Sequence, residues 1–165
     1  MQTETQSVIR ICSFPNIRPI NSIEEGLRLG NCRRSYPFIT DESVPLPQVK
    51  GEKALHLVYF RRTVRADEYG ELLQAEGKQP CRNAPNYLLG FISQVPEDKM
   101  PKELRNKTIV AAGLDTSSRV YNEHGIQHFL CVARFGDQHR TLQFTDTHIL
   151  WRSGSWIFLA EDLVP

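Results

Sequence analysis

An α+β protein is predicted, in which a strand–helix–helix–strand unit is followed by an antiparallel β-meander. Three observations support this fold class. Residues 54–60 and 108–113 are apolar on both faces, which is typical of strands covered on two sides. The stretch between them, 66–95, carries apolar side chains at helical spacing. After Gly113, alternating segments are separated by short polar turns, which indicates strands.

The chain is expected to divide into an N-terminal β/α extension, residues 1–53, and an α+β main domain, residues 54–165. The extension is expected to pack on the main domain. Residues 7–12 alternate between apolar and polar side chains and favour an edge strand. One further extended strand is expected around residues 36–40.

A short helix is predicted between these two strands. Ser22 is a good N-cap, and Glu25 stands three residues later, which is the spacing of a capping box. Gly30 is expected to end this helix because glycine is common just beyond the last turn.

The centre of the chain is expected to contain two helices. The first spans residues 66–76, where Gly77 is the natural end. The second runs from an N-cap at Asn83 to the residue before Pro96, because proline disfavours helical geometry in the residue that precedes it. His56, inside the first buried strand, is expected to be a core or edge histidine that is hydrogen-bonded to its surroundings.

The C-terminal part is expected to consist of strands and turns. Residues 127–135, 141–145 and 156–160 have strand patterns, and the turn 122–125 places a glycine where a positive φ is needed. Strands joined by short turns are expected to pair with their neighbours in the sequence.

Composition excludes several classes of protein. The 165 residues carry a formal net charge of +1, which argues against nucleic-acid binding by bulk electrostatics. No apolar run is long enough to span a membrane, so no membrane partner is expected. The N-terminus lacks the layout of a signal peptide, and a cytoplasmic location is expected by default.

No motif in the chain indicates a reaction or a cofactor. The four cysteines are widely spaced and form no CxxC pair. His124 and His128 have a spacing that would suit a metal on a helix, but the intervening glycine favours a hairpin that separates them. We therefore assign no catalytic residue, no metal ligand and no cofactor.

Several short segments resemble a family of uncharacterised bacterial proteins. They are Leu57-Val-Tyr-Phe60, Asp67-Glu68, Gly77-x-x-Pro80, Leu88-Leu-x-Phe91, Ile109-Val-Ala-x-Gly113 and Phe158-Leu-Ala160. Members of that family have no assigned activity to transfer to this chain. The resemblance therefore implies a bacterial protein of the same fold without implying a site.

The order of elements is also similar to that of C-type-lectin-like folds. The calcium and sugar motifs of those proteins are absent from the chain, as are the paired catalytic cysteines of the related sulfatase-modifying enzymes. This resemblance implies a scaffold that displays loops, and it supplies no site residues.

The favoured function is a non-enzymatic binding or interaction module that uses the turns of the C-terminal meander. Trp151 and Trp156 flank the last turn, and tryptophan gives a large contact area with few torsions. Tyr121, His128 and Arg140 are expected to share a patch with them. The partner is unknown, and a protein or a small ligand is favoured.

Two alternatives remain open. The first is an enzyme with a dispersed site, built around His56, His128, Asp115 and Arg134. The second is binding of an anion or nucleic acid through Arg61, Arg62 and Arg65, together with other arginine clusters.

Overall fold

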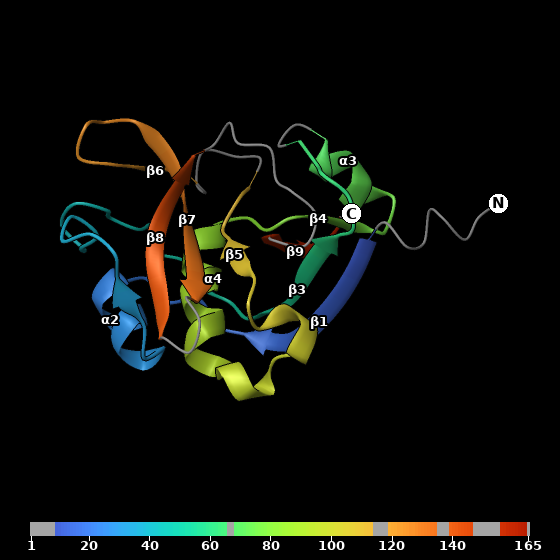
Figure 1. Ribbon diagram of the computed structural model, residues 1–165, viewed down its shortest axis with the longest axis horizontal. Helices are drawn as coiled ribbons and strands as arrows, with labels where there is room; N and C mark the ends of the chain where they lie inside the picture. The colour runs from blue at the N-terminus through green and yellow to red at the C-terminus, as the bar shows by residue number, and fades with distance from the viewer. Residues whose placement is uncertain (1–8, 66–67, 114–118, 135–138, 147–155, 165) are drawn as a thin grey trace.

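A computed structural model describes residues 9–65, 68–113, 119–134, 139–146 and 156–164. These residues form a nine-stranded sheet with helices on both faces (Figure 1). Helix and strand contents agree with the predicted α+β class.

The strands of the sheet run in the order β1-β3-β9-β5-β7-β8-β2, while β4 pairs with β9 and β6 pairs with β7. Their bounds are β1 (Ile9–Ile17), β2 (Arg33–Arg34), β3 (Lys53–Phe60), β4 (Lys78–Pro80), β5 (Thr108–Val110), β6 (Val120–Tyr121), β7 (Gln127–Arg134), β8 (Arg140–Asp146) and β9 (Trp156–Asp162). The helices are α2 (Ile23–Leu29), α3 (Tyr69–Gln74) and α4 (Ala84–Gln94), followed by the 3-10 turns η1 (Glu97–Lys99) and η2 (Lys102–Leu104).

The sheet separates two hydrophobic cores. On one face, α2 and α4 pack against strand residues that include Leu57, Leu130 and Leu159. On the other face, α3 packs against the intervening positions, including Val58 and Phe158. Alternation along each strand therefore sends neighbouring residues into different cores, as the double-sided apolar strands predicted.

The ends of α2 confirm the predicted helix signals. Ser22 is the N-cap, and its Oγ accepts a hydrogen bond from the Glu25 N–H at 3.1 Å. Gly30 is the C-cap. The helix buries Ile23 and Leu27 against α4, so its position depends on packing as well as on its caps.

The two central helices are also present. Helix α3 is shorter than the predicted span 66–76, of which residues 66–67 lie outside the described part of the chain. Helix α4 follows Asn83, which is the N-cap with a left-handed backbone (φ 53°) and no side-chain capping bond. The helix ends before Val95 and Pro96, as predicted.

The prediction of a simple C-terminal meander is wrong for the last strand. Strands β7 and β8 pair as antiparallel neighbours, but β9 does not lie beside β8. It inserts between β3, to which it is antiparallel, and β5, to which it is parallel. The reason is burial: residues 157–160 of β9 are buried on both faces and therefore suit the middle of the sheet.

The place beside β8 is taken by β2, which comes from the first 53 residues and pairs with β8 in parallel. The strand expected around residues 36–40 is a series of bends and turns instead, because Pro37 interrupts the extended chain. Since β1 pairs with β3 at the opposite edge, the N-terminal segment supplies both ends of the sheet order.

Candidate functional site

The structure describes four of the five predicted contact residues and does not bring those four together. Trp151 lies outside the described residues, and Trp156 begins β9 in the middle of the sheet, where it packs against the α3-side core. Arg140 begins β8 opposite Arg134, whereas His128 pairs with the other end of that strand. Only Tyr121 and His128 lie near each other, on the paired strands β6 and β7.

Arg140 is also buried rather than presented to solvent. Its Nη1 donates to the carbonyl oxygens of Ile92 at 3.2 Å and Val95 at 3.0 Å, which closes the C-terminal end of α4. Glu97 bridges Arg140 and Arg134, at 3.3 and 3.1 Å. A cavity of about 270 Å³ adjoins these three side chains. The role of Arg140 in the structure is to cap a helix and to hold η1.

Arg61, Arg62 and Arg65 lie exposed after β3. Glu68 accepts hydrogen bonds from Arg62 Nη1 at 3.3 Å and from the Arg65 backbone N–H at 2.9 Å. The carboxylate therefore neutralises part of this charge, and anion binding here stays a prediction. Of the dispersed-enzyme residues, Asp115 lies outside the described part of the chain.

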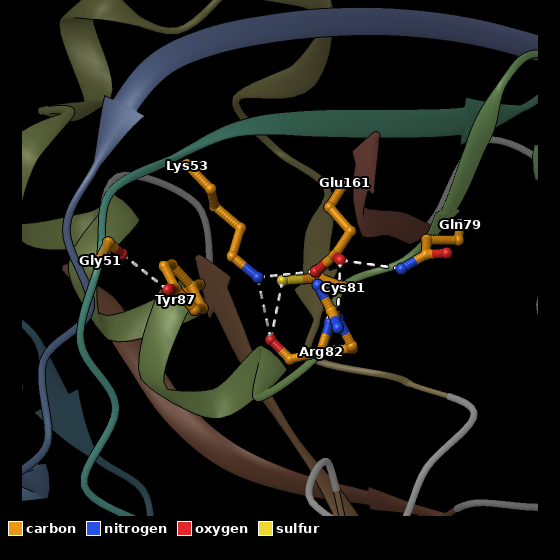
Figure 2. Close-up of polar contacts among 7 residues, drawn as sticks. All are labelled: Gly51, Lys53, Gln79, Cys81, Arg82, Tyr87 and Glu161. Atoms are coloured by element: carbon orange, nitrogen blue, oxygen red, sulfur yellow. Dashed lines mark hydrogen bonds and ion pairs between the residues drawn. The ribbon is translucent and has the colours of Figure 1, made fainter. Parts of the chain in front are cut away.

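A highly connected polar group of the described residues lies on the other face of the sheet from α3, and no sequence motif marked it. Glu161, on β9, is only 4% exposed, and its carboxylate accepts four hydrogen bonds (Figure 2). The donors are Lys53 Nζ (2.7 Å), the Arg82 backbone N–H (2.7 Å), Gln79 Nε2 (2.8 Å) and Arg82 Nε (3.0 Å). We call Glu161, Lys53, Gln79 and Arg82 the Glu161 network.

Two neighbours complete the surroundings of the network. Lys53 Nζ lies 4.1 Å from the centre of the Tyr87 ring, and the Tyr87 hydroxyl donates to the Gly51 carbonyl oxygen at 2.7 Å. Cys81 lies beside Arg82 and is fully buried (Figure 2). The network thereby joins β3, β4, β9 and the start of α4.

The chemistry of the network is that of a structural clamp. Burial alone would raise the pKa of Glu161, but hydrogen bonds from Lys53 and the Arg82 N–H outweigh it, and the pKa lies below its ordinary value. Burial raises the pKa of the Cys81 thiol to about 12, which suppresses the reactive thiolate. Glu161 is thus a bound anion with its acceptor positions filled, and it is not placed to transfer protons.

Aromatic rings gather around Phe144 of β8, at the β8–β2 edge of the sheet. The Phe144 ring has three ring neighbours: Tyr36 (centroids 6.4 Å apart, planes at 21°), Phe38 (6.5 Å) and His128 (5.5 Å). We call Tyr36, Phe38, His128 and Phe144 the aromatic surface. Tyr36 is 54% exposed, although it stacks on Phe144.

A hairpin stands beside the aromatic surface. Its turn is fixed by Asn122, whose Oδ1 accepts from the His124 N–H at 2.9 Å and the Ile126 N–H at 3.0 Å. Gly125 has the predicted positive φ, 73°. The hairpin exposes Tyr121 (51%) and Ile126 (57%), and His128 Nδ1 lies 2.9 Å from the Ile126 carbonyl oxygen. Since this carbonyl is an acceptor, His128 Nδ1 must be the donor.

Three residues of the aromatic surface escaped the sequence prediction. Tyr36 and Phe38 come from an irregular segment, and only the parallel β2–β8 pairing, extended by the Ser35 N–H to the Leu142 carbonyl oxygen (3.0 Å), places them over Phe144. Phe144 itself falls on the alternating face of residues 141–145, which was a usable signal.

Within the described residues, no group of three histidine, cysteine, aspartate or glutamate side chains gathers closely enough to hold a metal ion. None of the helices in that part of the chain is both long and apolar enough to cross a membrane. Searches against protein-family models, curated proteins and solved structures find no match to this chain. The resemblances to uncharacterised bacterial proteins and to C-type-lectin-like folds therefore stay predictions.

Proposed function

We propose that this protein is a binding module, and that its contact region is the aromatic surface together with the hairpin 121–127. The observation that carries the proposal is Tyr36, which is 54% exposed while stacked on Phe144. An aromatic ring held by stacking loses little conformational freedom when it is covered by a partner, and large rings dominate the energetics of interfaces. Two further exposed side chains, Tyr121 and Ile126, extend the same contact region.

The chemistry of this region favours a protein partner. Exposed apolar and aromatic side chains suit a partner surface that supplies its own pocket. Two cavities among the described residues, of about 270 and 320 Å³, lie elsewhere, beside Arg140 and between α3 and β4. A C-type-lectin-like topology, which the order of elements resembles, would be a display scaffold of this kind.

The proposal can be tested with a photo-crosslinking amino acid in cells of the source organism. We expect adducts from positions 36 and 126, and no adducts from position 163. Leu163 is a matched control because it is an exposed apolar residue (40%) near the end of the chain. The same adducts from all three positions would argue for non-specific contact and against this contact region.

Purified partner then allows a quantitative test. Replacing Tyr36 with alanine is expected to cost about 2 kcal/mol of binding free energy if the ring is a central contact. This corresponds to a loss of roughly 30-fold in affinity. The control substitution Leu163→Ala is expected to leave affinity unchanged. An unchanged affinity for the folded Tyr36→Ala variant would contradict the proposal.

A further inference from the structure

Three polar side chains form a hydrogen-bonded row across the opposite edge of the sheet. His56 lies between them: its Nδ1 is 2.7 Å from the Ser13 hydroxyl oxygen, and its Nε2 is 2.9 Å from Asp162 Oδ1. Ser13 and His56 are directly paired residues of β1 and β3. His56 pairs in turn with Ala160 of β9, two residues before Asp162. The row therefore depends on strand pairing and lies on the α3 side of the sheet.

The carboxylate decides which nitrogen of His56 carries the proton. A deprotonated nitrogen facing Asp162 would set a lone pair against an anion, so Nε2 must be the donor. Neutral imidazole then has its lone pair on Nδ1, where it accepts the hydrogen bond of the Ser13 hydroxyl. This is the arrangement of a general base that is held in one tautomer by an acid and placed against a hydroxyl nucleophile.

The middle of the row is buried, whereas both of its ends are exposed. His56 is 5% exposed, whereas Ser13 is exposed and the Asp162 side chain is 64% exposed. Lys78 Nζ lies 3.3 Å from the same Asp162 oxygen that His56 contacts, which keeps the carboxylate charged. Hydrogen bonds on both ring nitrogens are expected of any buried histidine and do not by themselves indicate catalysis. The exposed Ser13 hydroxyl does point to catalysis, because a substrate can reach it.

We propose that Ser13, His56 and Asp162 form an acyl-transfer site for carboxylic esters. Ser13 Oγ attacks the ester carbonyl carbon while His56 Nδ1 takes the hydroxyl proton. The carbon–oxygen bond to the alcohol breaks, and His56 returns the proton to the departing alcohol. His56 Nδ1 then takes a proton from water as the water oxygen attacks the acyl-serine. The bond between the acyl carbon and Ser13 Oγ breaks, His56 returns the proton to Ser13 Oγ, and the carboxylic acid is released. Asp162 is a positioning residue that holds the imidazole.

The position of β1 gives the substrate a place to lie. This strand ends the sheet order, so its outer side pairs with no strand among the described residues. An extended acyl group that contains amide bonds can align along such an edge as an added strand and hydrogen-bond to the backbone there. The inference goes beyond the proposed binding function and uses the other edge of the sheet from the aromatic surface, so either proposal can fail alone.

The experiment uses the full chain with a fluorophosphonate probe and with p-nitrophenyl acetate. The probe phosphonylates a nucleophilic serine with loss of fluoride, and mass spectrometry locates the label. We expect labelling at Ser13 in the folded protein and none in urea. The Ser13→Ala variant should lose the label, whereas Ser35→Ala, which removes an exposed serine beyond β2, should retain it.

The role of the imidazole is tested by His56→Gln and Asp162→Asn. General-base assistance supplies roughly 100-fold or more in rate, so each variant is expected to lose labelling and acetate hydrolysis by about that factor. Because His56 is buried and its replacement can affect folding, Asp162→Asn at the exposed end is the decisive variant. Its amide can donate to Nε2, which moves the ring proton to Nδ1 and removes the base from Ser13.

A spectroscopic readout separates this role from a structural one. Nitrogen-15 NMR of His56 should show a protonated Nε2 in the parent and a protonated Nδ1 in Asp162→Asn, at an unchanged melting temperature. The proposal is overturned by an unlabelled Ser13 in the folded parent. It is also overturned by equal labelling of folded Asp162→Asn, because the serine would then react without its base.

Discussion

The carboxylate of Glu161 accepts a hydrogen bond from Lys53 Nζ at 2.7 Å, although 108 positions separate the two residues in the chain. This pair fastens the first residue of β3 to the penultimate residue of β9. With Arg82 and Gln79 it fills the acceptor positions of a carboxylate that is 4% exposed. A buried charge of this kind is stable only while its partners stay in place.

Replacing Glu161 with glutamine should destabilise the fold. The amide keeps the shape of the side chain but sets a donor against the donors of Lys53 and Arg82, which leaves them without an anion. Because the Lys53 and Arg82 side chains remain 21% and 55% exposed, the expected cost is that of lost charged hydrogen bonds, about 1.5–3 kcal/mol. The measurement is the free energy of unfolding in urea. Glu52→Gln, at an exposed glutamate, is the control and should change it by less than about 0.5 kcal/mol.

The unfolding free energies of the parent and of Glu161→Gln should depend differently on pH. The pKa of Glu161 in the fold lies below its ordinary value of 4.5, so its stabilising contribution is complete above that value. The contribution is lost as pH falls through the lowered pKa of the folded state. The difference in unfolding free energy between the parent and Glu161→Gln should therefore shrink on acidification. A difference that stays constant down to the acid transition would mean that Glu161 is not ionised in the fold.

Gly90 in α4 should not tolerate alanine, although alanine is the better helix former by about 1 kcal/mol. A Cβ at this position would lie 1.9 Å from the Arg18 carbonyl oxygen, so the backbone before α2 would have to move. We expect Gly90→Ala to destabilise by about 1–3 kcal/mol, as overpacking does. Gly26→Ala is the comparison, because the three atoms nearest to its Cβ would all belong to the Leu89 side chain, at 2.8 to 3.0 Å.

The expected order of thermal stability is therefore parent, then Gly26→Ala, then Gly90→Ala, measured by circular dichroism. Both glycines lie in helices, so the intrinsic gain from alanine is shared and the difference reports the close contact. A Gly90→Ala variant that is more stable than the parent would show that the Arg18 segment can move without cost.

The four cysteines should react in two classes. Cys12 is partly exposed, whereas Cys32, Cys81 and Cys131 are buried. Burial raises the pKa of Cys32 to about 11 and that of Cys81 and Cys131 to about 12. A thiol reagent at mildly alkaline pH should therefore modify Cys12 first. Cys12→Ser should lose this fast phase, and its persistence in that variant would place a buried thiol within reach of solvent.

The local features were predictable because they depend on neighbours in the chain. The Ser22 cap and the Gly30 end of α2 follow from spacing alone, and the stop of α4 before Pro96 follows from proline geometry. The double-sided strand at residues 54–60 was predicted to be central, and β3 lies between β1 and β9. His56 was predicted to be a hydrogen-bonded histidine, and it is.

The candidate sites were much less predictable. Arg140 was expected in a surface patch, but in the structure its guanidinium is buried and donates hydrogen bonds to the carbonyl groups at the end of α4. Tyr36 carried no signal of function, because its exposure and its stacking on Phe144 arise from a strand pairing between the two halves of the chain. Glu161 is followed by a second acid, Asp162, and nothing in the sequence indicates the four donors that surround Glu161 in the fold.

Patterning by itself therefore determined the secondary structure of most segments and the α+β class, since caps, turns and apolar periodicity act over a few residues. Only the tertiary structure decided the place of β9 between β3 and β5, and with it the Glu161 network and the Ser13–His56–Asp162 row. Strand order is chosen by burial and hydrogen bonding among segments far apart in the chain. A single sequence does not record which of several compatible apolar strands will become neighbours.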